Sequence, residues 1–207
     1  MGLIMLDGLK RTDTGKNNKV TIGSSVRAND SEFIISGENN VIEIGDGTVL
    51  NKVKIIVESS NNKIVIGNNC RVTCRVIQKI SDGNTFTVGD GTTIGGANFI
   101  NGESSTIKIG SQCMFSYNID VRSTDSHAVF DLGTDERINQ AENIVIEDNV
   151  WVGAHVVLCK GSYIGSGSIV GISSVVAKAF KDKNIAVAGN PAKIIKEGVY
   201  WERPLLG

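Results

Sequence analysis

The sequence predicts an all-β protein, a parallel β-helix of about seven coils, and three observations lead to this fold class. An aliphatic residue stands at every sixth position of the stretch 144–176: Ile146, Val152, Leu158, Ile164, Val170 and Val176. Glycine often follows it, as a tight corner favours. Upstream, related phrases such as NNKVTIG, NNVIEIG and NNKIVIG recur at intervals of 21 or 22 residues. Because an α-helix repeats near 3.6 residues and a strand at 2, a period of six indicates short strands that turn a corner and stack on the next coil.

The composition fits one domain with many corners. The chain has 207 residues, a net charge of −1 and 24 glycines. Near-neutral charge argues against nucleic acid or an anionic membrane as a partner. Cys70, Cys74, Cys113 and Cys159 show neither disulfide nor zinc spacing, so we expect reduced core thiols. The start, MGLIMLDGLKRTD, is too short an apolar run for a secretory signal, and no stretch could span a bilayer. We therefore expect a soluble, cytoplasmic protein.

The repeats divide the chain into three parts. We expect residues 1–19 to form a lead-in or cap, residues 20–176 the β-helix, and residues 177–207 a C-terminal segment. One coil takes about three hexads and a wider third corner, at which asparagines are expected to stack as ladders. Coils are predicted to begin near Ile22, Ile44, Ile66, Val88, Ile109, Ile146 and Ile164.

Two segments break the repeat. Residues 123–143, STDSHAVFDLGTDERINQAEN, are polar and without periodicity, and a loop of this length inside a solenoid is usually functional. After Val176 the hexads end. There Asn190 is suited to cap a short helix that begins at Pro191 and ends near Glu197.

The hexads, the histidine-bearing loop, the segment NVWVGAHVVLCKG and the tail AGNPAKIIKE together resemble the hexapeptide-repeat acyltransferases, in their O-acetyltransferase branch. The likeness extends over nearly the whole chain. Within that branch, TDSHAVFDLGTDERIN and a tryptophan soon after the tail are similar to bacterial O-acetyltransferases of capsular polysialic acid and related polysaccharides. The resemblance implies a left-handed β-helix, a homotrimer and acetyl-CoA as co-substrate.

Transfer of an acetyl group to a sugar hydroxyl needs a base, and imidazole exchanges protons near neutral pH. The chain has two histidines. His127 lies in the inserted loop, where the resemblance places the catalytic base. His155 falls inside a hexad at an outward position, so we expect no direct role for it. Asp125 or Asp120 is a candidate to orient His127.

The resemblance suggests further site residues. Asn98 matches an asparagine that contacts acetyl-CoA and substrate in galactoside-type relatives, and it is a candidate oxyanion donor. The backbone N–H of Gly153 or Ala154 is a second candidate. Trp151 occupies an outward hexad position, where an exposed indole could pack at a subunit interface or line the acceptor site. The resemblance places a tryptophan here near the catalytic histidine, so we expect Trp151 to line the acceptor site beside His127.

Coenzyme A carries phosphates that favour cations and free N–H groups. The resemblance places Ala177 and Lys178 near the pantetheine and phosphates. Lys193 and Lys196, three apart on the expected helix, would share a face toward the adenosine phosphate. Gly153, Ala154, Gly171 and Ile172 are expected along the same cofactor path, and no metal is expected.

Other β-helical proteins fit less well. A carbonic anhydrase of this shape needs three metal-binding imidazoles, and a nucleotidyltransferase needs a nucleotide-binding domain before the β-helix. An ice-binding solenoid would show a flat threonine-rich face and no long loop. A non-catalytic relative stays open. We expect an O-acetyltransferase for a bacterial surface polysaccharide, with capsular sialic acid as the leading acceptor. The alternative is acetylation of a small sugar or nucleotide-amino sugar.

Overall fold

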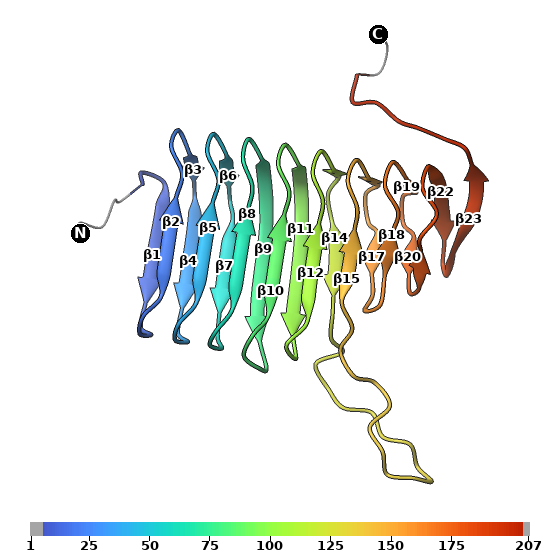
Figure 1. Cartoon of the computed structure of the whole chain (residues 1–207), viewed down its shortest axis with the longest axis horizontal. Coiled ribbons are helices and arrows are strands. Elements are labelled where there is room, and N and C mark those ends of the chain that lie inside the picture. Colours follow the sequence, from blue (N-terminus) through green and yellow to red (C-terminus); the bar gives the residue numbers. More distant parts are fainter. Residues whose placement is uncertain (1–5, 205–207) are drawn as a thin grey trace.

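The computed structural model describes residues 6–204, which form a parallel β-helix of 23 strands without an α-helix in that range (Figure 1). Each coil runs along three faces of a prism. The second face is a sheet of eight strands, one per coil: β2 (Lys19–Ile22), β5 (Val41–Ile44), β8 (Lys63–Ile66), β10 (Thr85–Val88), β12 (Thr106–Ile109), β15 (Ile144–Ile146), β18 (Tyr163–Ile164) and β21 (Ala179–Phe180). There are therefore eight coils.

The first and third faces are joined in one sheet of 15 strands. The first face holds β1 (Leu9–Asp13), β4 (Ser31–Ile35), β7 (Lys54–Val57), β14 (Ile119–Arg122), β17 (Val157–Leu158) and β20 (Val175–Val176). The third face holds β3 (Arg27–Asn29), β6 (Val49–Asn51), β13 (Met114–Phe115), β16 (Trp151–Val152), β19 (Ile169–Val170) and β22 (Ile185–Gly189). The long strands β9 (Arg71–Lys79) and β11 (Thr93–Gly102) turn from the third face onto the first.

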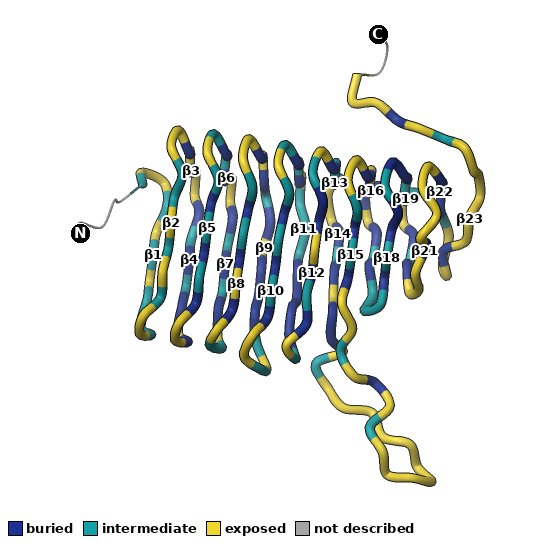
Figure 2. The backbone as a smooth tube through the Cα atoms, in the orientation of Figure 1, coloured by how far each residue is buried: buried dark blue, intermediate teal, exposed yellow. Residues whose placement is uncertain are grey.

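We name the corners in chain order: the first corner leads from the first face to the second, the second corner to the third face, and the third corner back to the first. The aliphatic residues of the hexads point inward and are buried from the second coil onward, while those of the first coil are partly buried and the corners are largely exposed (Figure 2). Phe33, Phe86 and Phe99 fill the wider part of the core, and the rings of Phe86 and Phe99 lie 4.9 Å apart. Neighbouring coils thus share one core and one hydrogen-bonded ladder.

Asparagines stack from coil to coil, as predicted, at the wide corner of the repeat, which is the first corner in this naming. Asn62 donates a hydrogen bond to Asn40 Oδ1 at 2.9 Å, and Asn84 donates to Asn62 Oδ1 at 3.0 Å. At the second corner the backbones approach too closely for a side chain, because a Cβ on Gly45 would lie 2.5 Å from the carbonyl carbon of Gly67. Glycine at this position therefore keeps the corners in register.

Three expectations need correction. There are eight coils, because Phe180 enters the core only four residues after Val176, through a shortened corner that breaks the hexad. The prism begins before residue 20, since β1 already pairs with β4. The expected short C-terminal helix is wrong. Residues 192–197 form β23 (Ala192–Glu197), which pairs antiparallel with the open edge of β22 and so satisfies its free backbone groups.

The remaining segments lie outside the regular coils. The loop predicted at 123–143 lies between β14 and β15, and it projects from the first corner (Figure 1). After β23 the chain runs back along the prism toward the earlier coils. The expected lead-in and C-terminal segment extend into residues 1–5 and 205–207, which fall outside the described residues. Within residues 6–204 we find no helix that could cross a membrane.

Candidate active site

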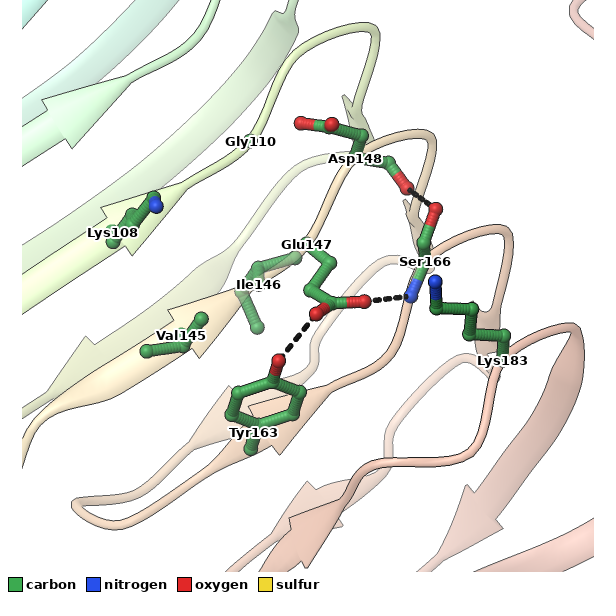
Figure 3. A pocket seen from close by; sticks show the side chains of 9 residues that line it. All are labelled: Lys108, Gly110, Val145, Ile146, Glu147, Asp148, Tyr163, Ser166 and Lys183. Atoms are coloured by element: carbon green, nitrogen blue, oxygen red, sulfur yellow. Dashed lines mark hydrogen bonds between the residues drawn. The ribbon is translucent and has the colours of Figure 1, made fainter.

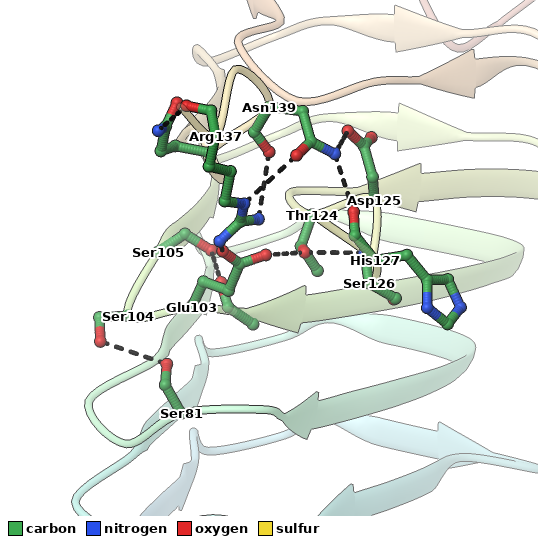
Figure 4. A network of polar contacts seen from close by, with 12 residues as sticks. Ser81, Glu103, Ser104, Ser105, Thr124, Asp125, Ser126, His127, Arg137 and Asn139 are labelled. Atoms are coloured by element: carbon green, nitrogen blue, oxygen red, sulfur yellow. Dashed lines mark hydrogen bonds and ion pairs between the residues drawn. The ribbon is translucent and has the colours of Figure 1, made fainter. Parts of the chain in front are cut away.

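The inserted loop is anchored to the prism by an ion pair at its base. Arg137 Nη1 lies 2.6 Å from Glu103 Oε2, and the Thr124 hydroxyl donates to the other oxygen of the same carboxylate (Figure 4). Thr124 Oγ1 in turn accepts the N–H of Ser126 at 3.0 Å. The hydrogen bond from Arg137, together with that from Thr124, lowers the pKa of Glu103. Glu103 follows β11, so this contact ties both arms of the loop to the coil below it.

Asn139 holds the histidine-bearing arm of the loop against the returning arm. Its Nδ2 donates to the backbone oxygen of His127 at 2.8 Å and to Asp125 Oδ2 at 2.8 Å. Its Oδ1 accepts the N–H of Val129 at 2.7 Å. The Asn139 side chain is thus enclosed in an otherwise exposed loop, and it fixes the main chain on both sides of residue 128.

His127 is exposed, and its imidazole points away from this network (Figure 4). Neither expected orienting residue bonds to the ring. Asp125 is paired with Lys160 Nζ at 2.5 Å, and this pair is the main reason that its pKa is lowered. Asp120 accepts hydrogen bonds from Arg122 Nε at 2.7 Å and Asn98 Nδ2 at 2.9 Å. Within residues 6–204 the imidazole nitrogens therefore have no hydrogen-bond partner from the chain, and both are open to a ligand.

Asn98 lies on the same face as the root of the loop. Its strand neighbour across the sheet is Asp120, two residues before Arg122, where β14 ends and the loop begins. One amide hydrogen of Asn98 is committed to Asp120, and its buried Oδ1 has no partner among the described residues. Asn98 thus has one amide hydrogen left to donate.

Trp151 lies on the third face, between Met114 and Ile169 of the adjacent coils. It is 38% exposed, and its ring packs on that of Trp201, with 6.1 Å between centroids. The loop leaves from the first corner, whereas Trp151 follows the second corner. A single chain therefore does not bring Trp151 and His127 together.

The expected cofactor-binding glycines form a column at the third corner. A Cβ on Gly153 would lie 2.8 Å from the backbone nitrogen of Ile172, and one on Gly171 would lie 2.9 Å from Cβ of Ala188. Both positions need glycine for the stacking itself. The N–H of Gly153 donates to Val170 O at 2.8 Å, so this backbone candidate is already committed to an acceptor. Ile172 is largely exposed on the outside of this column.

The expected phosphate-binding lysines lie at two places. Ala177 and Lys178 form the first corner of the last coil, along the same prism edge as the loop and Lys160, and Lys178 Nζ lies 5.1 Å from the centroid of Phe180. Lys193 and Lys196 lie on β23 instead of a helix. Lys193 pairs with Ala188 and Lys196 pairs with Ala186, and both alanines occupy outward positions of β22. The register shifts between these two pairs, which compensates for the odd spacing of the lysines. Both lysines therefore still point to one face.

A separate hollow of about 300 Å³ lies on the second face (Figure 3). Glu147 occupies its centre, where it accepts hydrogen bonds from the Tyr163 hydroxyl and, at 2.8 Å, from the Ser166 N–H. The hydrogen bond with Tyr163 lowers the pKa of Glu147 and raises that of Tyr163. None of the residues that line it was expected in the site.

Sequence reasoning missed the residues that hold the site in place. Arg137, Asn139 and Lys160 fall inside the segments that carry the resemblance, but the sequence assigns them no role, because their roles depend on how the loop closes on itself. Trp201 was noted only as a tryptophan near the end of the chain. No group of three or more metal-ligating side chains occurs within residues 6–204.

Comparisons with known proteins agree with this architecture. No family model matches the chain. A polysialic acid O-acetyltransferase of Escherichia coli O1:K1 is 35% identical over 121 residues, which is 58% of this chain and 39% of the relative. The sequence match thus spans about two fifths of that relative's length.

Two solved structures match almost throughout. The crystal structure of the polySia-specific acetyltransferase NeuO has a TM-score of 0.91 and 31% identity, and the match covers 97% of this chain and 92% of that one. The polysialic acid O-acetyltransferase OatWY has a TM-score of 0.92 and 28% identity, over 95% and 92%. The left-handed parallel β-helix that the sequence predicts is thereby confirmed. Near-complete coverage of both chains at this identity shows that the chain belongs to the hexapeptide-repeat O-acetyltransferase family, together with the polysialic acid O-acetyltransferases.

Proposed function

We propose that the chain is an acetyl-CoA-dependent O-acetyltransferase that acts on a hydroxyl of a bacterial surface polysaccharide, with sialic acid in a capsule as the leading acceptor. The observation that carries this proposal is the likeness to two polysialic acid O-acetyltransferases over nearly the whole chain. The alternative, acetylation of a small sugar or nucleotide-amino sugar, rests on the wider family resemblance. An enzyme that uses acetyl-CoA would work in the cytoplasm, where this donor is made.

His127 is proposed as the general base. Its imidazole would take the proton of the acceptor hydroxyl while that oxygen attacks the thioester carbonyl, and would then return the proton to the departing sulfur. Two features support this role. The ring nitrogens have no hydrogen-bond partner within residues 6–204, and the backbone oxygen of His127 is held by Asn139. The remaining amide hydrogen of Asn98 and the N–H of Ala154 are proposed donors to the oxyanion.

The site is proposed to lie between subunits of a homotrimer. His127 extends from the first corner, and Trp151 follows the second corner, so one prism cannot supply both to one acceptor. Three prisms around a threefold axis would give three equivalent clefts, each with His127 from one chain and Trp151 from the next. The imidazole of His127 has no hydrogen-bond partner within residues 6–204, as expected if a neighbouring subunit completes the site.

Phosphate contacts are proposed for Lys178, Lys193 and Lys196. The last two share the outer face of the β22–β23 hairpin, close to the glycine column of the third corner. Their charges are exposed, so the contribution of each to binding should depend on salt. Gly153, Ala154, Gly171, Ile172 and Ala177 are proposed to line the path of the pantetheine arm.

The test is acetyl transfer by the purified chain to a panel of acceptors, followed as free thiol release and as acetate esters on the product. Polysialic acid, free sialic acid, neutral polysaccharides and a nucleotide-amino sugar separate the acceptor classes. His127→Ala should abolish most turnover, and His155→Ala is the matched control, since His155 is exposed at the third corner. Equal activity of both variants would remove His127 from the mechanism. No ester on any polysaccharide would refute the leading acceptor class.

A further inference from the structure

The last described residues form a strap across the prism, which we call the C-terminal strap (residues 199–204). It begins where the N–H of Val199 donates to Asn184 O at 2.9 Å, at the second corner of the last coil. It then follows that prism edge backward. Trp201 Nε1 donates to Asn149 O at 2.8 Å in the sixth coil, and Arg203 reaches carbonyl groups of the fifth and fourth coils. Six residues thus connect coils that are far apart in sequence.

Trp201 is the buried centre of the strap. It is only 8% exposed, whereas the adjacent Tyr200 is 77% exposed. Its ring is tilted by 47° against that of Trp151. A buried indole whose N–H is satisfied by a backbone carbonyl has a fixed position, and an aromatic ring packed on it is restricted in turn. One side of Trp151 is therefore set by Trp201, while the rest of its surface stays open.

Arg203 fastens the far end. Its Nη1 donates to Thr93 Oγ1 at 2.8 Å and its Nη2 to Cys113 O at 2.9 Å. Longer contacts join Nη2 to Gly91 O at 3.3 Å and Gln112 O at 3.4 Å. The guanidinium thereby bridges two successive corners. Without this anchor the β22–β23 hairpin, the Val199 N–H and the Trp201 contacts would hold the strap.

We infer that Trp201 is a positioning residue that sets the indole of Trp151 for the acceptor, and that Arg203 keeps Trp201 in place. This inference rests on the proposed function, in which Trp151 lines the acceptor site. An aromatic wall contacts a sugar ring through its flat face, so the orientation of the indole decides the fit. On this account the third face would bind its acceptor through a surface that the C-terminal strap builds.

The test uses the fact that the chain has two tryptophans. Two indoles this close couple excitonically, so far-ultraviolet circular dichroism of the wild type should show a couplet. Trp201→Ala should abolish the couplet and raise the acceptor KM by roughly 3- to 10-fold, the value of one aromatic contact, with the acetyl-CoA KM unchanged. Trp201→Phe also removes the couplet but keeps a ring, so it should retain most of the acceptor affinity. Tyr200→Ala, at an exposed neighbour, should change neither readout.

Arg203→Ala is the distal probe, since the hydrogen bonds of Arg203 go to Thr93 and to backbone carbonyls and not to either tryptophan. It should weaken the couplet and raise the acceptor KM in the same direction as Trp201→Ala. A wild type without a couplet would overturn the contact itself. A couplet that is lost in Trp201→Ala with an unchanged acceptor KM would overturn the positioning role alone. A couplet with no acetyl transfer by the wild type would overturn the proposed function, and this role with it.

Discussion

Asn139→Ala should loosen the inserted loop while the prism stays intact. The side chain makes four hydrogen bonds: to His127 O, Asp125 Oδ2, the Val129 N–H and Arg137 Nε. At about 0.5–1.5 kcal/mol net for each bond, the sum is roughly 2–6 kcal/mol. The loop is exposed and water can replace some partners, so the lower end, about 2 kcal/mol, is the appropriate figure. That corresponds to roughly a 30-fold larger opening constant for the loop.

The assay is hydrogen exchange at Ile138, whose N–H crosses the loop to Val129 O at 2.9 Å and does not touch Asn139. Its exchange should accelerate about 30-fold, in step with the opening constant. The kcat/KM should fall only as far as the closed population falls, because the base leaves its position only in the open fraction of the loop. The melting temperature of the prism should hardly change. Gln140→Ala is the neighbouring control, since Gln140 is exposed and its side chain makes a single hydrogen bond within residues 6–204, to Arg137 O. Unchanged exchange at Ile138 would refute the account of Asn139 as the residue that closes the loop.

Three further predictions concern the base, the cofactor and pH. His127→Ala should lower kcat by about 10² to 10⁴ with an unchanged melting temperature, and near wild-type kcat would contradict the role of the base. Lys193→Ala should raise the acetyl-CoA KM at low salt and leave kcat alone, whereas an equal KM would mean that this lysine is merely solvated. The pKa values of Glu103 and Asp125 are lowered by Arg137 and Lys160, so their stabilisation of the loop is complete above their ordinary values, 4.5 and 3.8, and is lost as the pH falls through the lowered ones. Loop exchange, corrected for intrinsic rates, should thus rise only below about pH 4.5, and a rise between pH 6 and 8 would oppose this.

The regular part of the fold could be predicted because its cause is local and repeated. Inward positions such as Val152, Leu158 and Val170 all need an aliphatic side chain, so the six-residue spacing of aliphatic residues alone identifies the core. The loop is recognised as the stretch in which aliphatic residues no longer recur at every sixth position.

The C-terminal segment shows where local signals fail. Asn190 and Pro191 are good residues for a helix start, but the open edge of β22 offers hydrogen bonds to a strand, and β23 takes them. Trp201 and Arg203 contact residues that are 52 and 90 positions away. The sequence repeat contains no information about such long-range contacts. Likewise, the pairing of Asp125 with Lys160 instead of His127 depends on the stacking of two first corners.

The most direct test of the central claim is complementation between two inactive variants. His127→Ala and Trp151→Ala are unfolded together in equal amounts, refolded as a mixture and assayed for acetyl transfer. If each site takes His127 from one chain and Trp151 from the next, random assortment leaves about a quarter of the sites intact. The mixture should therefore regain about a quarter of the wild-type kcat, while each variant refolded alone stays inactive. A refolded mixture of trimers with no more activity than its separate components would contradict a site shared between subunits.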